Sequence, residues 1–375
     1  MATRPILICV PELFREIGGI QNFSRTLIAA CDEICGRPVT VLSRNDRHSD
    51  CPNEFVQGRK LHCVGYIPSR LRPFGLMAAS LRYRNHLILT THPRFAPWLQ
   101  ILQRGSQGCY ATFAHGIEVW GDWTPAFKRG MESASRILAV STFTENSIRD
   151  HLNGKAPPIE VFPNAIDSRR FFPGSRLNGM RRRLGIADEA TVMLTVARVA
   201  KSEEKKGYRL ILESMPRLVR EFPNLVWVLA GKGNDLDDVR ELASATGVSD
   251  RCRFLGFVSD DDLPELYRSA DLFVLPSRKE GFGIVFLEAI ASGLPVIAGN
   301  QDGSIDALDH GRLGLLINPD SQTELIEAIR SAIDGRLPDH LKDPTALHRA
   351  CTARFGFDAF RDRLKLSLQQ MGWIE

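Results

Sequence analysis

The sequence predicts an α/β protein of two domains, each built around a parallel β-sheet. Its 375 residues exceed what one ordinary hydrophobic core holds, so two domains of roughly 150–200 residues are expected. Short apolar runs alternate with amphipathic segments through both halves, which is the pattern of parallel strands joined by crossover helices. A segment rich in proline and polar residues, 162–175, separates the halves and is interpreted as the interdomain linker.

Apolar runs of three to seven residues mark the expected strands, because strands buried on both faces are continuously hydrophobic. In the first half they are Ile6–Val10, Pro38–Leu42, Leu87–Thr90, Ala111–Ala114 and Arg136–Val140. In the second half they are Val192–Val196, Asn224–Ala230, Cys252–Leu255, Leu272–Leu275, Pro295–Ala298 and Leu315–Ile317. After these the chain is expected to be helical over Gln322–Ile333, Pro344–Arg354 and Asp358–Gln370.

Composition favours a cytoplasmic globular protein, with 43% apolar and 25% charged residues. No run approaches the ~18–20 apolar residues that a membrane helix needs, and the first residues lack the features of a signal peptide. The eight cysteines form no Cys-x-x-Cys pair. Cys31 and Cys35 lie one helical turn apart and could form a metal pair, but buried thiols are the favoured interpretation.

The net charge of +4 is unevenly distributed along the chain. Residues 1–170 hold 21 Lys and Arg against 14 Asp and Glu, a balance of +7, and the rest hold 27 against 30, a balance of −3. A basic first half could meet an anionic substrate or a membrane surface. Ordinary variation of surface charge explains the same numbers, and both readings stay open.

The most informative segment runs from Glu280 to Glu288. It follows the strand Leu272–Leu275 and a Pro-Ser breaker, and it opens a helix that is apolar nearly all round. Such a helix is expected to be buried, and Glu288 is the one charge inside it. A buried carboxylate is costly unless it is hydrogen-bonded, so a ligand that carries hydroxyl groups is expected to supply the partner.

Glycines follow two other predicted strands. Gly18-Gly19-Ile20-Gln21 lies between the first strand and an amphipathic helix, where the backbone can approach a ligand and the helix N-terminus favours an anion. The alternative is a tight turn without a ligand. The pair Gly231 and Gly233 lacks the third glycine of a dinucleotide-binding fingerprint, so a nicotinamide-type nucleotide site is not indicated.

Two cations and a histidine are expected at the carboxyl edges of the sheets, where open α/β sheets bind ligands. Arg198 follows a strand and Lys206 precedes Gly207 at a helix start, with Lys205 as a rival to Lys206. The two cations and the helix after Gly283 could form a diphosphate site, or they could belong to a solvated loop. His115 could donate a hydrogen bond to a substrate hydroxyl or phosphate, or be structural.

A possible metal motif, Asp260-Asp261-Asp262, has a simpler explanation. Ser259 and these acids read as the N-cap and acidic first turn of a helix. We therefore predict no metal site.

Together these motifs, in this order along most of the chain, resemble the retaining glycosyltransferases of family 4. The motifs are Gly18–Gln21, His115–Glu118, Pro163–Asp167, Arg198 with Lys206-Gly207, Leu229–Gly233, Phe254–Val258, and Glu280 through Glu288 to Val296. The resemblance implies the GT-B fold: two Rossmann-like, doubly wound parallel-sheet domains facing a cleft, with a C-terminal helix that crosses back. It implies an acceptor domain at 1–165, completed by about 358–375, and a sugar-nucleotide donor domain at 166–357.

The resemblance also implies roles for the candidate residues. The catalytic residues would be Glu280 facing the donor sugar, Arg198 and Lys206 neutralising the leaving diphosphate in place of a metal, and His115 near the donor sugar. The donor-binding residues would be Gly18, Gly19, Gln21, Phe257, Gly281, Phe282, Gly283, Ile284 and Glu288. Among these, Glu288 would bind the ribose hydroxyls, and the glycine loop at 281–284 would offer backbone N–H groups.

The function implied is metal-independent hexose transfer from a UDP-sugar or GDP-sugar to a glycan or lipid-linked acceptor, in bacterial surface polysaccharide synthesis. No cofactor and no nucleic acid partner is expected. The basic, apolar segment 68–84 could rest on an anionic membrane at the inner face, or be a helix packed on the sheet. Two alternatives remain: another sugar-nucleotide enzyme on this fold, such as an epimerase or phosphorylase, and a non-catalytic scaffold of a polysaccharide complex.

Overall fold

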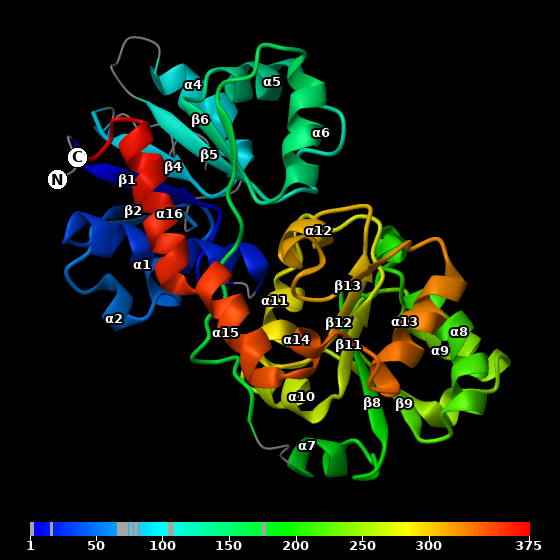
Figure 1. Ribbon diagram of the computed structural model, residues 1–375. Helices are drawn as coiled ribbons and strands as arrows, with labels where there is room; N and C mark the ends of the chain where they lie inside the picture. The colour runs from blue at the N-terminus through cyan, green and yellow to red at the C-terminus, as the bar shows by residue number, and fades with distance from the viewer. Residues whose placement is uncertain are drawn as a thin grey trace. The chain divides into compact units, whose positions relative to one another are not determined.

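The chain divides into two compact units in the computed structural model, which describes residues 4–15, 18–65, 74, 78, 82–83, 85–103, 109–174 and 178–375. The first unit comprises Met1–Ala165 together with Phe357–Glu375, and the second comprises Ile166–Gly356 (Figure 1). The basic, apolar segment 68–84 lies mostly outside the described residues, so both of its readings stay predictions.

The first unit, in its described residues, is built around a seven-stranded parallel sheet of order β3-β2-β1-β4-β5-β6-β7. The strands are β1 (Ile6–Val10), β2 (Thr40–Ser43), β3 (Leu61–Cys63), β4 (Leu87–Thr90), β5 (Tyr110–Ala114), β6 (Arg136–Ala139) and β7 (Ile159–Val161). The helices are α1 (Gly19–Cys35), α2 (Asn53–Val56), α4 (Ala96–Gln103), α5 (Pro125–Glu132), α6 (Thr142–Leu152) and α16 (Phe357–Gln370), with the 3-10 turns η1 (His48–Asp50) and η2 (Pro93–Phe95). Because the strand order reverses between β1 and β4, the carboxyl ends of these strands form the position where such sheets bind ligands.

The first sheet is buried on both faces, which explains its continuous apolar strands. In β1, Ile6, Ile8 and Val10 pack in a cluster with side chains of α1 and α16. Leu7 and Cys9 point to the opposite face and pack with side chains of α4, α5 and α6. Two helical layers therefore cover this sheet, as in other parallel α/β domains.

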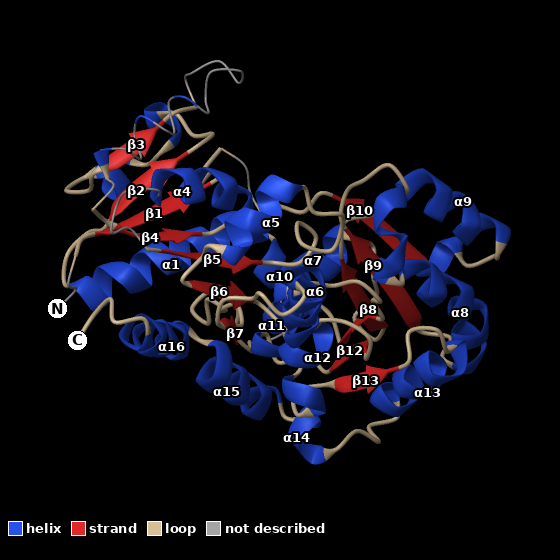
Figure 2. Cartoon of the chain, turned by 90° about the horizontal axis from the view of Figure 1, so that it is seen from above, coloured by secondary structure: helices blue, strands red, loops and turns tan. Residues whose placement is uncertain are grey.

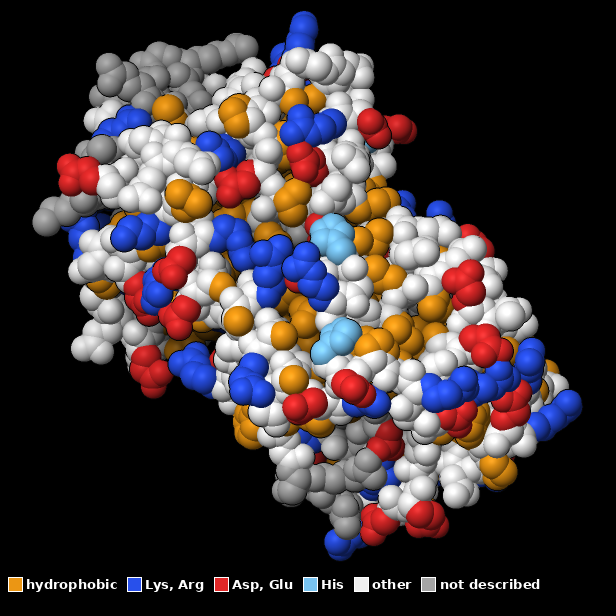
Figure 3. Space-filling view, in the orientation of Figure 1, with side chains coloured by type: hydrophobic (Ala, Val, Ile, Leu, Met, Phe, Trp, Pro, Cys, Tyr) orange, Lys and Arg blue, Asp and Glu red, His pale blue; other side chains and the backbone are white. Residues whose placement is uncertain are grey.

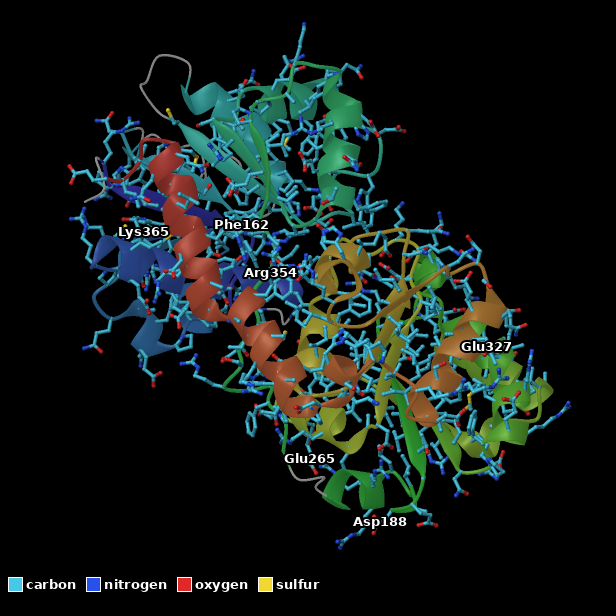
Figure 4. All side chains as sticks on the ribbon, viewed as in Figure 1. Phe162, Asp188, Glu265, Glu327, Arg354 and Lys365 are labelled. Atoms are coloured by element: carbon cyan, nitrogen blue, oxygen red, sulfur yellow. The ribbon has the colours of Figure 1, made fainter. Side chains whose placement is uncertain are left out.

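Helix α16 returns the end of the chain to the first unit, where it lies beside α1 (Figure 1). Its Phe360 ring lies 5.7 Å from Phe23 of α1 and 5.1 Å from Phe162, and Figure 4 shows Phe162 beside this helix. Phe360, Leu364 and Leu368 are all fully buried. Burying each contributes about 2 kcal/mol, so the first unit depends on residues from the end of the chain.

The second unit, in its described residues 166–174 and 178–356, has a six-stranded parallel sheet of order β10-β9-β8-β11-β12-β13. The strands are β8 (Thr191–Val196), β9 (Leu225–Ala230), β10 (Cys252–Gly256), β11 (Leu272–Leu275), β12 (Val296–Gly299) and β13 (Leu315–Ile317). The helices are α7 (Asn178–Arg183), α8 (Tyr208–Glu221), α9 (Leu236–Ala245), α10 (Leu263–Ser269), α11 (Ile284–Ala291), α12 (Ser304–Ala307), α13 (Gln322–Ile333), α14 (Asp339–Lys342) and α15 (Pro344–Phe355), with the 3-10 turns η3 (Lys201–Lys206), η4 (Ser249–Arg251) and η5 (Asp309–Gly311).

Helices cover both faces of this sheet as well. Figure 2 shows α8, α9 and α13 on one side and α10, α11 and α12 on the other. The side of α8, α9 and α13 holds a core of fully buried side chains around Trp227 of β9. Helix α11 is buried nearly all round, as its composition predicts.

The predicted strands and terminal helices are confirmed, with ends shifted by no more than two residues. Two edge strands, β3 and β7, were not predicted. Helix α1 begins at Gly19 rather than at Asn22, so one of the predicted loop glycines belongs to the helix. Glycine is tolerated in a first turn, because the N–H groups there have no intrahelical partner in any case.

The described residues contain no helix long and apolar enough to cross a membrane. On the face drawn in Figure 3, Lys and Arg side chains are interspersed with Asp and Glu. Ion pairs such as Arg149 with Glu145, 2.6 Å apart, and Arg330 with Glu221, 2.8 Å apart, join oppositely charged side chains within each unit.

Candidate functional site

The second unit brings three of the predicted residues to one edge of its sheet. Arg198 follows β8 and Glu280 follows β11, and these strands are parallel neighbours, with Phe273 opposite Leu194. Their carboxyl ends therefore meet at the same edge. Lys206 reaches this edge from η3, just before α8.

Gly207 fixes the approach of Lys206 to this edge. Its φ is +79°, and a Cβ atom there would lie 2.2 Å from the carbonyl oxygen of Pro276, so only glycine fits. The close approach places the start of α8 against the segment that leads to Glu280. Lys206 Nζ donates a hydrogen bond to Glu280 Oε2, whereas Lys205 is exposed.

The charge of Lys206 is maintained by its neighbours. Burial by itself would lower the pKa of this ammonium group, but the carboxylates of Glu280, Glu203 and Asp302 together raise the pKa above its ordinary value. Glu203 Oε2 lies 3.8 Å from Lys206 Nζ, and Glu203 Oε1 lies 3.9 Å from Arg198 Nη1. The two predicted cations therefore share one carboxylate that sequence reasoning did not identify.

Asp302 positions the backbone of Glu280, and sequence reasoning missed it. Asp302 Oδ2 accepts hydrogen bonds of 2.7 Å from Glu280 N and from Ser277 Oγ, and its Oδ1 accepts one from Ser304 N. A Cβ atom on Gly303 would lie 2.1 Å from the carbonyl oxygen of Gly281. The signal in the sequence was an Asp-Gly pair shortly after the strand β12, where turn residues at a carboxyl edge are candidates for a site.

The loop Gly281–Ile284 leads directly into α11. Gly283 has a φ of +86° and precedes the helix without any side-chain cap, and the first turn contains no acidic residue. Phe282 is buried, with its ring 5.8 Å from Phe355, so what this residue can offer a ligand is its backbone. An uncapped helix N-terminus of this kind favours an anion.

Glu288 lies in the buried part of α11, with 8% of its surface exposed. Burial raises its pKa to about 7, although a hydrogen bond from Tyr267 and the charge of Arg170 act in the opposite direction. Tyr267 Oη donates to Glu288 Oε2 at 2.8 Å. The expectation that a ligand supplies the hydroxyl partner is therefore revised, because Tyr267 supplies one already.

Phe257 and the glycines near it lie at the carboxyl ends of β9 and β10. The Phe257 side chain is 59% exposed, and Lys232 Nζ lies 5.1 Å from the centre of its ring. Cβ atoms on Gly231 and Gly233 would lie 1.7 and 2.0 Å from the carbonyl oxygens of Ala197 and Val199. These glycines therefore allow close packing of two loops.

The first unit holds its glycine loop in place through a polar network. Gln21 is buried, and its Nε2 donates to Glu12 Oε1 at 2.8 Å. Asn45 Nδ2 donates to Glu12 Oε2 at 2.6 Å. Gly18 is extended, and a Cβ atom there would lie 2.8 Å from Gln21 Oε1, so Gln21 covers Gly18 at the start of α1.

Asp46 also holds this loop in place, and the sequence did not predict this role. It is fully buried, and its carboxylate accepts hydrogen bonds from the backbone N–H groups of Leu13 (2.7 Å), Phe14 (3.3 Å) and Arg15 (3.1 Å). Ser43 Oγ also donates to it, at 2.6 Å. A carboxylate on β2's carboxyl end therefore fixes the loop between β1 and α1.

His115 lies at the carboxyl end of β5, where its backbone N donates to Glu118 Oε1 at 2.5 Å. Its Nε2 lies 3.0 Å from the carbonyl oxygen of Thr91, which can only accept, so Nε2 carries the proton. Burial lowers the pKa of His115 below its ordinary value. A neutral ring then has only Nδ1 left, which accepts a hydrogen bond, and the expected donor role is revised to an acceptor role.

The acidic run and the cysteines have structural surroundings. Ser259 Oγ accepts from the Asp262 backbone at 3.1 Å directly before α10, and Arg170 binds the carbonyl oxygen of Asp260 at 2.7 Å. Cys31 is buried, and burial raises its pKa well above the ordinary value. Within the described residues, no group of three or more His, Cys, Asp and Glu side chains is arranged to hold a metal ion.

Both halves of the chain match known protein families. Residues 17–170 match the family described as Glycosyltransferase Family 4, and residues 179–347 match the one described as Glycosyl transferases group 1. The chain belongs to the family 4 glycosyltransferases and has the GT-B fold.

Three curated relatives illustrate the similarity. The GDP-mannose-dependent alpha-(1-6)-phosphatidylinositol monomannoside mannosyltransferase of Mycobacterium tuberculosis is 30% identical over 59% of this chain and 60% of its own length. The mannosylfructose-phosphate synthase of Agrobacterium fabrum is 31% identical over 52% of this chain and 44% of its own length. The D-inositol 3-phosphate glycosyltransferase of Geodermatophilus obscurus is 35% identical over 54% of this chain and 46% of its own length. The chain thus spans about half the length of these relatives.

Solved structures share the fold over nearly the whole chain. The Anabaena protein HepE in complex with UDP has a TM-score of 0.78 at 19% identity and covers 98% of this chain and all of its own. The sucrose-phosphate synthase of Thermosynechococcus elongatus has a TM-score of 0.75 at 20% identity, and the match covers 98% of this chain and 99% of its own. At this level of identity, the likeness concerns the fold alone.

Proposed function

We propose that this protein transfers a hexose from a nucleotide-diphosphate sugar to a glycan or lipid-linked acceptor, with the donor bound by the second unit. The observation that carries the proposal is the joint position of Arg198, Lys206 and Glu280 at one sheet edge, beside an uncapped helix N-terminus. A diphosphate leaving group gains negative charge as the anomeric bond breaks, and fixed positive groups stabilise that charge.

The reaction is proposed to retain the anomeric configuration without a covalent intermediate. Glu280 is engaged by Lys206, which makes its carboxylate a poor nucleophile. A front-face substitution, in which the donor's own phosphate oxygen takes the acceptor proton, needs no nucleophilic side chain. Retention also follows the family's general behaviour. The anomeric coupling constant of the product in an NMR spectrum tests it directly.

Metal independence is part of the same proposal. Arg198, Lys206 and the N-terminus of α11 supply positive charge at the position where a divalent ion would otherwise be required. No cofactor is invoked, and transfer that persists in EDTA is the expected result.

Recognition of the donor is assigned to the residues around α11 and β10. Glu288 is placed at the ribose, where its ionised form accepts from two hydroxyl groups, and Phe257 offers an exposed ring next to β10 for a base. In the first unit, Gln21 and His115 Nδ1 are assigned to sugar hydroxyl groups. Relatives that use GDP-mannose and a neighbour bound to UDP make both nucleotides candidates.

The acceptor is proposed to belong to bacterial surface polysaccharide synthesis, with the enzyme associated peripherally with the inner face of an anionic membrane. Relatives named for phosphatidylinositol mannosides and for small sugar phosphates support an acceptor with a polar head. Flotation with anionic liposomes at low salt tests the membrane part, and absence of binding removes it.

A thermal-shift screen of UDP, GDP and their sugars is the first experiment. A ligand that binds the folded state alone raises its melting temperature, so one nucleotide series should stand out. Transfer of labelled sugar from the selected donor follows, with Arg198→Ala expected to lower turnover by at least ~100-fold. Near-normal transfer by that variant, or an epimerised donor without any acceptor, contradicts the assignment.

A further inference from the structure

Glu203 lies between the two cations that the donor diphosphate is proposed to use. Its two carboxylate oxygens face Arg198 Nη1 at 3.9 Å and Lys206 Nζ at 3.8 Å. Only 16% of the Glu203 side chain is exposed, whereas 71% of the Arg198 side chain is. A single partly buried carboxylate thus faces both positive groups.

The cluster has no net positive charge as it stands. Arg198 and Lys206 contribute two positive charges, which Glu203 and Glu280 balance, and the carboxylate of Asp302 adds further negative charge near Lys206. A sugar-nucleotide diphosphate adds two further negative charges. Binding is favourable only when one of the carboxylates withdraws, because like charges that remain within a few ångströms repel the ligand.

Glu203 is the carboxylate that is held less tightly. Glu280 accepts a hydrogen bond from Lys206, and its backbone N donates to Asp302. Glu203, in contrast, faces both cations at distances beyond hydrogen-bond range. It also lies in η3, where its φ of −114° and ψ of 21° interrupt the helical turn, so its side chain can turn away without unwinding a regular helix.

We propose that Glu203 is a built-in counter-ion: it holds Arg198 and Lys206 together in the empty site and is exchanged for the diphosphate of the donor. This inference rests on the proposed function. The exchange lowers the affinity for any diphosphate, since the ligand must displace a charge already in place. It therefore speeds release of the nucleoside diphosphate product, a step that limits many enzymes.

The test compares Glu203→Gln with the parent protein by isothermal titration calorimetry. The probes are inorganic pyrophosphate and whichever of UDP and GDP raises the melting temperature. Glu203 lies 3.8–3.9 Å from the two cations, and attraction over about 4 Å is worth about 1 kcal/mol even at the dielectric constant of water, so removing this competing charge should strengthen diphosphate binding about fivefold. The gain should shrink as ionic strength rises, and product inhibition by the same nucleotide should become stronger.

Two controls separate this role from a general change of charge. Glu213→Gln removes an exposed carboxylate on α8 and should leave both affinities unchanged. The matching nucleoside, which lacks phosphate, should bind the parent and Glu203→Gln equally. Circular dichroism checks that each variant is folded.

The possible outcomes are distinct. Equal or weaker diphosphate binding by Glu203→Gln overturns the counter-ion inference and leaves the proposed function standing. A parent protein that binds no nucleoside diphosphate overturns the proposed function, and this inference with it. Tighter binding of both pyrophosphate and nucleotide by Glu203→Gln, with Glu213→Gln unchanged, supports the exchange.

Discussion

Replacing Glu288 with glutamine should stabilise the protein, and the stabilisation should be larger above pH 7 than near pH 5. Burial raises the pKa of Glu288 from 4.5 to about 7. Between these two pH values the Glu288 carboxyl group is mostly protonated in the folded state and mostly ionised in the unfolded state. The free energy of unfolding therefore falls as the pH rises from about 4.5 to about 7 and is level above that. Glutamine carries no charge at any pH and removes this loss.

The magnitude follows from the two pKa values. Their difference of about 2.5 pH units corresponds to about 3 kcal/mol, at 1.36 kcal/mol per unit. At pH 5 most of that loss has not yet occurred. The free energy of unfolding of the variant should therefore exceed that of the parent by about 1 kcal/mol at pH 5 and by about 3 kcal/mol at pH 8. The glutamine oxygen can still accept the hydrogen bond from Tyr267.

Urea unfolding at pH 5, 6, 7 and 8, followed by circular dichroism, measures the difference between the variant and the parent at each pH. Glu213→Gln, on the exposed surface of α8, is the matched control. A difference that is the same at pH 5 and pH 8 would refute the reasoning, because it would mean that ionising Glu288 costs nothing in the folded state.

Four further outcomes are expected. Affinity for a sugar nucleotide should fall as the pH drops from 8 to 6, and this dependence should vanish in Glu288→Gln, as calorimetry would reveal. Gly207→Ala should lower the melting temperature more than Gly185→Ala, since both have positive φ but a Cβ atom has open space only at Gly185. Asp302→Asn should reduce kcat about 10-fold or more with KM less affected, as steady-state kinetics would test, because Glu280 loses its fixed orientation. Transfer activity should survive dialysis against EDTA; a requirement for Mg²⁺ would remove the metal-independent scheme.

The positions of most strands and of the C-terminal helices could be predicted because local patterns determine them. The run Leu272–Leu275, the breaker after it and the apolar helix α11 are each visible within a few residues of sequence. The edge strands β3 and β7 were missed because a polar residue interrupts each of these three-residue strands, His62 in β3 and Glu160 in β7, whereas the equally short β13 is wholly apolar and was predicted. Short edge strands depend on the neighbouring strand for their pairing, which no local pattern encodes.

The supporting groups of the site could not be predicted for a different reason. Asp46 acts on residues more than thirty positions away in the chain, and Asp302 acts on Glu280. The sequence around Asp46 does not distinguish it from a surface carboxylate, and the Asp-Gly pair at Asp302 indicates a turn without indicating its contact with Glu280, since both roles depend on burial and on backbone groups brought near by the fold. The preference for Lys206 over Lys205, which Gly207 already indicates in the sequence, has its structural reason in the contact with Glu280.

The return of α16 to the first unit sets an order of events during synthesis on the ribosome. The core around β1 lacks Phe360, Leu364 and Leu368 until the last part of the chain has emerged, by which time every strand of the second unit is available. The second unit can thus complete its fold first, while one apolar face of the nascent N-terminal sheet is still exposed. Chaperones that shield hydrophobic surface should accordingly bind nascent chains through residues 1–165, and release them once the terminal helix docks.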